Sequence, residues 1–267
     1  MGQDDLKFPK SDIPDSPHQP ELIIRDHAMK NYHTNSHKMR WLKDVIDITD
    51  AHRFVDDFDT FISPVSGDGC ENVFAWDETV AAGGGTCALT DMVNGVLLLS
   101  TGQTENDAIE LAKPFEAFMC EDCYPLYAEI RFKISEAIQS DFWFGLVIGQ
   151  GWFGTPADAI IFESVDGDAS IRFITRTGAA QTLIDTGIDL ADNTWIRLGF
   201  HWDGDGTVRY FVIADGNAPQ TILAAGAHTT HIPTTELQPG FGIRSGADGA
   251  QLLYIDYVKC VQLRVIE

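Results

Sequence analysis

The sequence is poor in cysteine, in long apolar runs and in cations. Five cysteines in 267 residues, odd in number and widely spread, exclude a disulfide scaffold and predict reduced thiols. No uninterrupted apolar run approaches the roughly 20 residues that a membrane-spanning helix needs. Residues 1–5 (MGQDD) lack the basic and apolar regions of a signal peptide, so secretory export is not predicted.

Cations are scarce, and they are unevenly distributed. The chain carries 18 Lys and Arg against 40 Asp and Glu, a net charge of −22. Residues 1–55 hold eight cations and nine acids, so residues 56–267 carry almost the whole negative charge. Such a body repels phosphate groups, so neither nucleic acid nor an anionic membrane is an expected partner. The split indicates two functions in one chain, although acidity can also serve solubility alone.

Arrangements of catalytic residues are missing as well. Glycoside hydrolases with two carboxylates on one strand show Glu-x-Asp-x-x-Glu, which does not occur here. The nearest approaches are Asp56, Asp57 and Asp59, together with the isolated Asp256, and adjacent strand residues point to opposite faces. There is no Gly-x-Ser-x-Gly, and the glycines at 83–85 lack the Lys-Ser/Thr of a phosphate loop. We therefore expect that this protein is not an enzyme.

No metal or cofactor is expected either. Cys120 and Cys123 form a Cys-x-x-Cys, which is half of a zinc site or a redox pair, but no second ligand pair follows. Asp203 and Asp205 alternate as calcium ligands do, yet the later glutamate of a calcium loop is absent. Tight turns explain Asp203–Gly206, and also Asp166-Gly-Asp168, as hairpin connections.

The first 53 residues differ from the rest and are predicted to form an extended arm. Four prolines lie within the first twenty positions, which forbids a regular helix or a central strand there. The apolar residues Ile23, Ile24, Trp41 and Leu42 would invite aggregation if they stayed exposed on a free tail. We therefore expect them to make capsid or subunit contacts, either with this chain's own oligomer or with another protein.

Residues 54–267 read as one β-sandwich domain. Short runs rich in β-branched and aromatic residues recur between Gly, Asp and Asn clusters, and no amphipathic helix intervenes. Alternation is clear where Ile130, Phe132 and Ile134 share one face of a strand. The expected strands cover residues 54–58, 96–101, 126–134, 142–148, 159–164, 170–175, 181–186, 194–202, 207–213, 220–224 and 252–265.

A set of strand and turn segments resembles the concanavalin-like, laminin-G-like jelly roll, above all the version found in structural proteins of tailed bacteriophages. The segments are FVDDF (54–58), GVLLLSTG (95–102) followed by Asn106-Asp107, LYAEIRF (126–132), FGL (144–146), NTWIRL (193–198) and LYIDYV (253–258). The resemblance implies an all-β antiparallel sandwich with an extended N-terminal arm.

The resemblance also implies a role as a capsid decoration, or cement, protein of the virion. The acidic sandwich would stand outside the shell while the arm crosses and ties the major capsid protein subunits. An extended arm contacts much partner surface per residue and is ordered only on assembly. The protein would be made in the host cytoplasm, and a homo-oligomer, with a trimer as first guess, would suit the shell's symmetry.

The alternative is a carbohydrate- or receptor-binding module of a phage tail or fibre. Exposed aromatics would then serve as glycan platforms, with Trp76, Trp143 and Trp202 among the candidates. Trp152 and Phe153, flanked by glycines in GWFG, are the residues that we expect to be exposed, either as a ligand platform or as a subunit contact.

Overall fold

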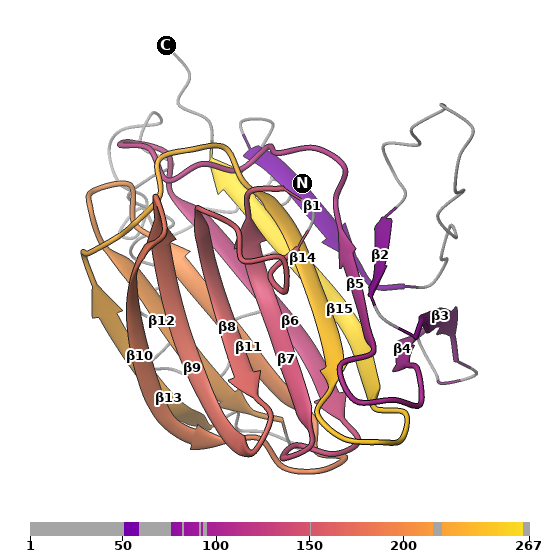
Figure 1. Cartoon of the computed structure of the whole chain (residues 1–267). Helices are drawn as coiled ribbons and strands as arrows, with labels where there is room; N and C mark the ends of the chain where they lie inside the picture. The colour runs from indigo at the N-terminus through magenta and orange to yellow at the C-terminus, as the bar shows by residue number, and fades with distance from the viewer. Residues whose placement is uncertain are drawn as a thin grey trace, which may run out of the picture.

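The computed structural model describes residues 51–58, 76–81, 83–90, 92, 95–149, 151–215 and 221–263. All regular elements in these ranges are strands, and they form two antiparallel sheets that lie one in front of the other (Figure 1). No helix long and apolar enough to cross a membrane occurs in the ranges given. The expected all-β jelly-roll sandwich is confirmed.

One sheet has eight strands, in the order β13-β12-β11-β6-β15-β4-β3, with β1 also paired to β15. The long strand β15 holds β4 along its first half and β1 along its second half, and β6 along its other edge. The strands of this sheet are β1 (Ala51–Asp56), β3 (Gly85–Leu89), β4 (Leu97–Thr101), β6 (Leu126–Ile134), β11 (Ile196–Trp202), β12 (Val208–Ala214), β13 (Ile222–His228) and β15 (Leu252–Leu263).

The second sheet has seven strands, in the order β10-β9-β8-β7-β14-β5-β2. Its centre consists of β7, β8 and β14, the strands farthest from both edges, and they carry buried residues along most of their length. The strands of this sheet are β2 (Asp77–Ala81), β5 (Ala108–Ala112), β7 (Ser140–Val147), β8 (Ala159–Val165), β9 (Asp168–Thr177), β10 (Ala180–Asp189) and β14 (Gln238–Ser245).

An aromatic core fills the space between the two sheets. Phe132 of β6 stacks on Phe142 of β7 with ring centroids 4.1 Å apart, which joins the two layers. Phe173 of β9 also joins the layers, through tilted ring contacts with Phe200 of β11 and Tyr210 of β12 at 5.9 and 5.0 Å. The predicted inward face of β6 is confirmed, because its alternate residues are fully buried.

Eleven runs predicted from the sequence each overlap a strand, and β6 has the predicted bounds. Four strands, β2, β3, β5 and β14, were missed by the sequence analysis. Strand β1 begins at Ala51 and so crosses the boundary expected between arm and body at residue 54. The predicted arm contacts Ile23, Ile24, Trp41 and Leu42 lie outside the described residues.

The two predicted hairpin turns connect β8 to β9 and β11 to β12. In the second turn, Asp203 Oδ1 accepts hydrogen bonds from the backbone N–H groups of Asp205 and Thr207, at 2.9 and 3.1 Å. Its other oxygen pairs with Arg209 at 2.7 Å. The Asp203 carboxylate is therefore committed to closing the turn.

Candidate functional site

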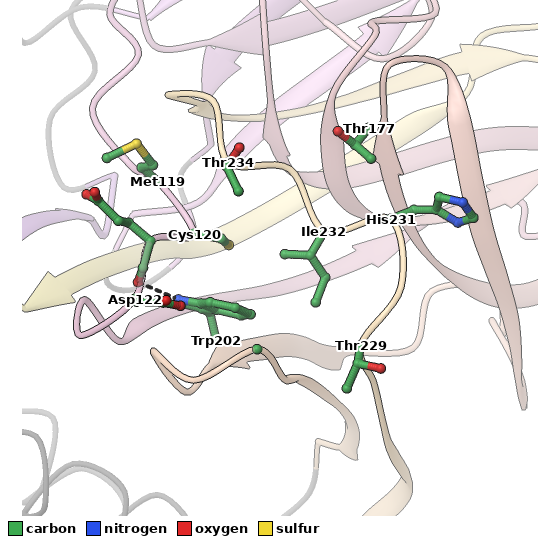
Figure 2. A pocket seen from close by; sticks show the side chains of 11 residues that line it. Met119, Cys120, Asp122, Thr177, Trp202, Thr229, His231, Ile232 and Thr234 are labelled. Carbon is green, nitrogen blue, oxygen red and sulfur yellow. Dashed lines mark hydrogen bonds between the residues drawn. The ribbon is translucent and has the colours of Figure 1, made fainter.

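A cleft of about 640 Å³ opens at one end of the sandwich, where β9 and β11 finish (Figure 2). Loops that precede β6, follow β11 and follow β13 complete its walls. The lining residues are Met119, Cys120, Glu121, Asp122, Thr177, Trp202, Gly206, Thr229, His231, Ile232 and Thr234.

Trp202, the last residue of β11, forms the floor of the cleft. The residue is only 4% exposed, and its indole Nε1 donates a hydrogen bond of 3.0 Å to the backbone oxygen of Glu121. This bond, drawn as the dashed line in Figure 2, fixes the loop that carries Asp122 beside the indole ring. Ile232 points toward the same ring from the opposite wall (Figure 2). The floor is therefore apolar and held in place.

The walls are polar and largely uncharged. Thr177, Thr229 and Thr234 offer hydroxyl groups, and Asp122 and His231 are exposed at the rim. None of the described residues that line the cleft is Lys or Arg. An apolar floor surrounded by hydroxyls and the carboxylates of Glu121 and Asp122 suits a ligand that has an apolar face and many hydroxyl groups.

A second group of functional side chains crosses the outer face of the seven-stranded sheet. Strand registers place Glu163 of β8 beside Trp143 of β7, and Trp143 beside Gly242 of β14. On the other side of Gly242 lies Glu110 of β5. Three strand spacings, about 14 Å, therefore separate the two glutamate Cα atoms.

Glycine at β14 makes room for the Trp143 indole. A Cβ at Gly242 would lie 2.6 Å from Trp143 Nε1, and a Cβ at Gly240 would lie 2.6 Å from the far edge of the same ring. The indole therefore spans β14 at close approach. Its N–H faces the Glu110 carboxyl and helps to hold the pKa of that carboxyl down, yet it makes no hydrogen bond of normal geometry.

The loop between β7 and β8 covers this face of the sheet. The backbone N–H of Phe153 donates a hydrogen bond of 3.0 Å to Glu110 Oε1, and Trp152 Nε1 donates one of 2.8 Å to Glu163 Oε2. The guanidinium of Arg176 lies 5.6 Å from the centroid of the Trp152 ring, and that of Arg244 lies 4.7 Å from the Phe153 ring. Both aromatic residues are thus half-buried rather than exposed.

Burial dominates the electrostatics of both glutamates. It raises the pKa of Glu110, although the N–H groups of Phe153, Trp143 and Trp152 that face this carboxyl act in the opposite direction. Burial also raises the pKa of Glu163, against the hydrogen bond from Trp152 and the charge of Arg172. The two carboxyl groups therefore hold their protons at higher pH than exposed glutamates would.

Sequence reasoning did not find Glu110 or Glu163. They are 53 positions apart on β5 and β8, so no local motif links them. Among the candidate platforms, Trp143 is fully buried and Trp76 is 1% exposed. Asp56 and Asp256 were the nearest approaches to a glycosidase pattern in the sequence. Asp56 accepts a hydrogen bond of 2.8 Å from the indole N–H of Trp76, and Asp256 pairs with Arg131.

The cysteines of the described ranges have free thiols. Cys120 and Cys260 are buried, Cys123 is exposed, and Cys87 is half-buried. Within these same ranges, no group of three or more His, Cys, Asp or Glu side chains is arranged to hold a metal ion. Cys120 and Cys123 therefore stand without further ligands among the described residues.

No protein-family model matches the chain, and no curated protein matches its sequence. Solved structures do match. A protein of unknown function from Shewanella oneidensis MR-1 aligns over 87% of this chain and 96% of its own, with 15% identity and a TM-score of 0.59.

Two further structures have named roles. An endo-1,3-beta-glucanase from Streptomyces sioyaensis aligns over 81% of this chain and 98% of its own, with 13% identity and a TM-score of 0.51. Arcelin-5, a lectin-like defense protein from Phaseolus vulgaris, aligns over 81% and 100%, with 10% identity and a TM-score of 0.50. At these identities the likeness concerns the fold. The chain has the concanavalin-like jelly-roll fold that lectin-like proteins and glucanases share.

Proposed function

We propose that this protein is a non-enzymatic carbohydrate-binding β-sandwich that holds a neutral saccharide in the cleft above Trp202. The observation that carries the proposal is the composition of that cleft, an apolar floor within walls of threonine hydroxyls and two carboxylates, Glu121 and Asp122. A sugar ring presents an apolar face and peripheral hydroxyls, which these groups complement. The absence of Lys and Arg from the described lining, and the acidic body, disfavour anionic saccharides.

Binding without cleavage fits the placement of the carboxylates. Glycosidases place two carboxyl groups about 5–10 Å apart across the bond that breaks. Glu110 and Glu163 are separated by three strands with Trp143 between them, and neither lines the cleft. The cleft itself carries two exposed carboxylates, Glu121 and Asp122, and both come from the single loop that precedes β6.

The test is a titration of the full chain with laminarihexaose, a neutral β-1,3-glucan oligomer, followed by NMR and calorimetry. The choice of probe follows the glucanase of the same fold. The expected result is chemical-shift change at the Trp202 indole and at the threonines of the cleft. Thr177→Val and Asp122→Ala should each weaken binding by about tenfold, because each removes one hydrogen-bonding group.

Thr221→Val is the matched control, since Thr221 precedes β13 at the end opposite Thr229 and is exposed. It should bind the hexaose as the unchanged chain does. The proposal is overturned if the NMR resonances of the cleft residues do not shift at millimolar laminarihexaose and do not shift at millimolar mannohexaose either. Release of shorter sugars, abolished by one Asp or Glu substitution, would overturn its non-enzymatic part.

A second candidate function is capsid decoration. We propose that such a sandwich serves as a virion structural protein that attaches to the major capsid protein of a tailed phage through residues 1–53. The observation that favours this is the charge split between a near-neutral first segment and a strongly acidic remainder. Like charge keeps the acidic parts of neighbouring copies apart, while the neutral segment is free to contact a shell.

The test compares the full chain with a chain that lacks residues 1–50, which leaves β1 intact, for binding to purified capsids. Quantitative mass spectrometry of virions counts the copies per particle. The decoration function requires many copies per particle and loss of capsid binding on deletion. Large apolar anchors such as Trp41 each contribute about 2 kcal/mol or more to an interface. A deleted chain that stays folded and still saturates capsids would rule this function out, and a few copies per virion would favour a tail or fibre location.

A further inference from the structure

An apolar patch lies on the outside of the seven-stranded sheet, separate from the aromatic core. It consists of Trp143, Val147, Ala159, Ile161 and Ile174, from β7, β8 and β9, none more than 1% exposed. The outer face of an antiparallel sheet is ordinarily polar because it meets water. Five apolar side chains on this face can be fully buried only if another segment covers them. If that segment moved away, the exposed patch would be of the kind that marks a binding surface.

Among the described residues, the apolar side chains that pack over the patch are those of Trp152 and Phe153, in the segment 151–155. Two hydrogen bonds, one to Glu110 and one to Glu163, hold it at either end of the row that contains Trp143. At Gly151 a Cβ would lie 2.6 Å from the Glu110 carboxyl, so this carboxyl is seated directly against the loop backbone. The attachment thus depends on a few polar contacts at the edges of the patch.

We propose that residues 151–155 are a displaceable lid over a second saccharide site, built from Trp143, Glu110 and Glu163. The class of ligand rests on the proposed function, whereas the lid itself does not. In the closed state the Phe153 backbone N–H and the Trp152 indole N–H occupy the two carboxylates that saccharide hydroxyls would contact. The Trp143 ring then receives the sugar face.

The unpartnered indole N–H of Trp143 supports this assignment. It is fully buried, it faces Glu110, and it has no hydrogen bond of normal geometry while the lid is closed. Buried donors without partners are rare, because each costs free energy. A ligand hydroxyl that accepts from this N–H satisfies a donor that the closed lid leaves unsatisfied.

Proton linkage gives the lid a direction of response to pH. Arg244 faces Glu110, while Arg172, Arg244 and Asp141 face Glu163. Burial raises both glutamate pKa values in spite of the arginines and of the N–H donors of the lid. The closed lid, in which the glutamate pKa values are raised, binds protons more tightly than the open lid. The stabilisation of the closed lid by these protons is complete below the ordinary glutamate pKa and is lost as pH rises through the raised pKa. The lid should therefore be tightest in acid and open more readily toward neutral pH.

The experiment follows hydrogen–deuterium exchange of the tryptophan indole N–H groups by NMR on the full chain, with Trp143→Phe used to assign the Trp143 resonance. In the unchanged chain the Trp143 indole N–H should exchange slowly. Trp152→Ala should speed this exchange by at least about tenfold, since it removes a hydrogen bond and a covering ring. Trp195→Ala is the control, because Trp195 lies over Arg131 on the eight-stranded sheet, 4.3 Å from ring centroid to guanidinium.

Glu163→Gln is the matched variant that imitates the protonated carboxyl while keeping an acceptor for Trp152. It should slow Trp143 exchange at neutral pH and flatten its pH dependence. The lid proposal is overturned if Trp143 exchange is unchanged in Trp152→Ala. It is also overturned if Trp143 exchange in the unchanged chain, corrected for intrinsic rates, slows as pH rises. Laminarihexaose should bind the Trp152→Ala chain at Trp143 more tightly than it binds the unchanged chain. Faster Trp143 exchange in Trp152→Ala without any sugar binding would overturn the proposed ligand class but not the proposal that residues 151–155 are a lid.

Discussion

Trp152 donates its indole N–H to Glu163 across 2.8 Å, and this bond fastens the β7–β8 loop to the neighbouring strand. We predict that Trp152→Phe lowers the free energy of unfolding by about 1–3 kcal/mol, because a largely buried carboxylate loses a donor while the ring remains. Chemical denaturation measures the change. Trp195→Phe serves as comparison and should cost less than about 1 kcal/mol, since it keeps a ring beside Arg131.

Phe173 lies at the centre of the aromatic core, fully buried and in contact with Phe162, Phe200 and Tyr210. Phe173→Ala should destabilise the protein by about 3–5 kcal/mol, because it removes apolar contacts and leaves a cavity. Leu183→Ala on the adjacent strand β10 should change stability by no more than about 0.5 kcal/mol, since that leucine is exposed. Equal effects of the two substitutions in thermal or urea unfolding would contradict the core described above.

Asp203 gives the β11–β12 turn a predictable pH dependence. Burial acts to raise its pKa, but Arg209 and the N–H groups of Asp205 and Thr207 outweigh burial and lower the pKa below the usual 3.8. Its stabilising effect is therefore present above pH 3.8 and lost as pH falls through the lowered value. Asp203→Asn should cost about 1–2 kcal/mol at pH 7 and progressively less in acid. A difference that stays constant down to pH 2 would contradict this account.

The four described thiols should differ in reactivity. Burial raises the pKa of Cys87 to about 12, with further contributions from Glu78, and burial also raises the pKa of Cys120 and Cys260. Cys123 is exposed. With iodoacetamide at pH 8 and peptide mapping, Cys123 should be labelled first, and Cys120 and Cys260 only after unfolding. Rapid labelling of Cys120 in the native protein would show that the cleft end opens.

The strands that could be predicted from the sequence are those whose alternation is long and uninterrupted. Strand β6 is an example, because nine residues alternate without Gly or Pro. Strand β14 was missed because Pro239, Gly240 and Gly242 are typical of loops. Pro239 is tolerated here because the pairing of β14 with β5 begins only at Gly240. The close approach of the Trp143 ring explains the two glycines, and that contact is visible only in three dimensions.

The site residues were harder to predict, for a related reason. The sequence singled out Trp152 and Phe153 from their flanking glycines, but the side chains that draw them onto the sheet come from distant strands. Glu110, Arg176 and Arg244 belong to β5, β9 and β14, and strand order alone brings them together. The cleft was missed because its walls come from loops that share no spacing. Trp202 was named as a candidate exposed platform, but it is only 4% exposed and belongs to the core beneath the cleft.

The register of β1 decides where the first fifty residues join the sandwich. Ala51 pairs with Leu263, and the ring of His52 lies 4.9 Å from that of Phe118, the residue before Met119 of the cleft. A partner that binds residues 1–50, as the decoration proposal requires, would be joined to the sandwich at the end where the cleft opens. Joining two binding sites in one chain raises the effective concentration of the second partner. A glycan that the cleft binds only weakly in free solution would therefore be bound far more completely when it belongs to the tethered partner.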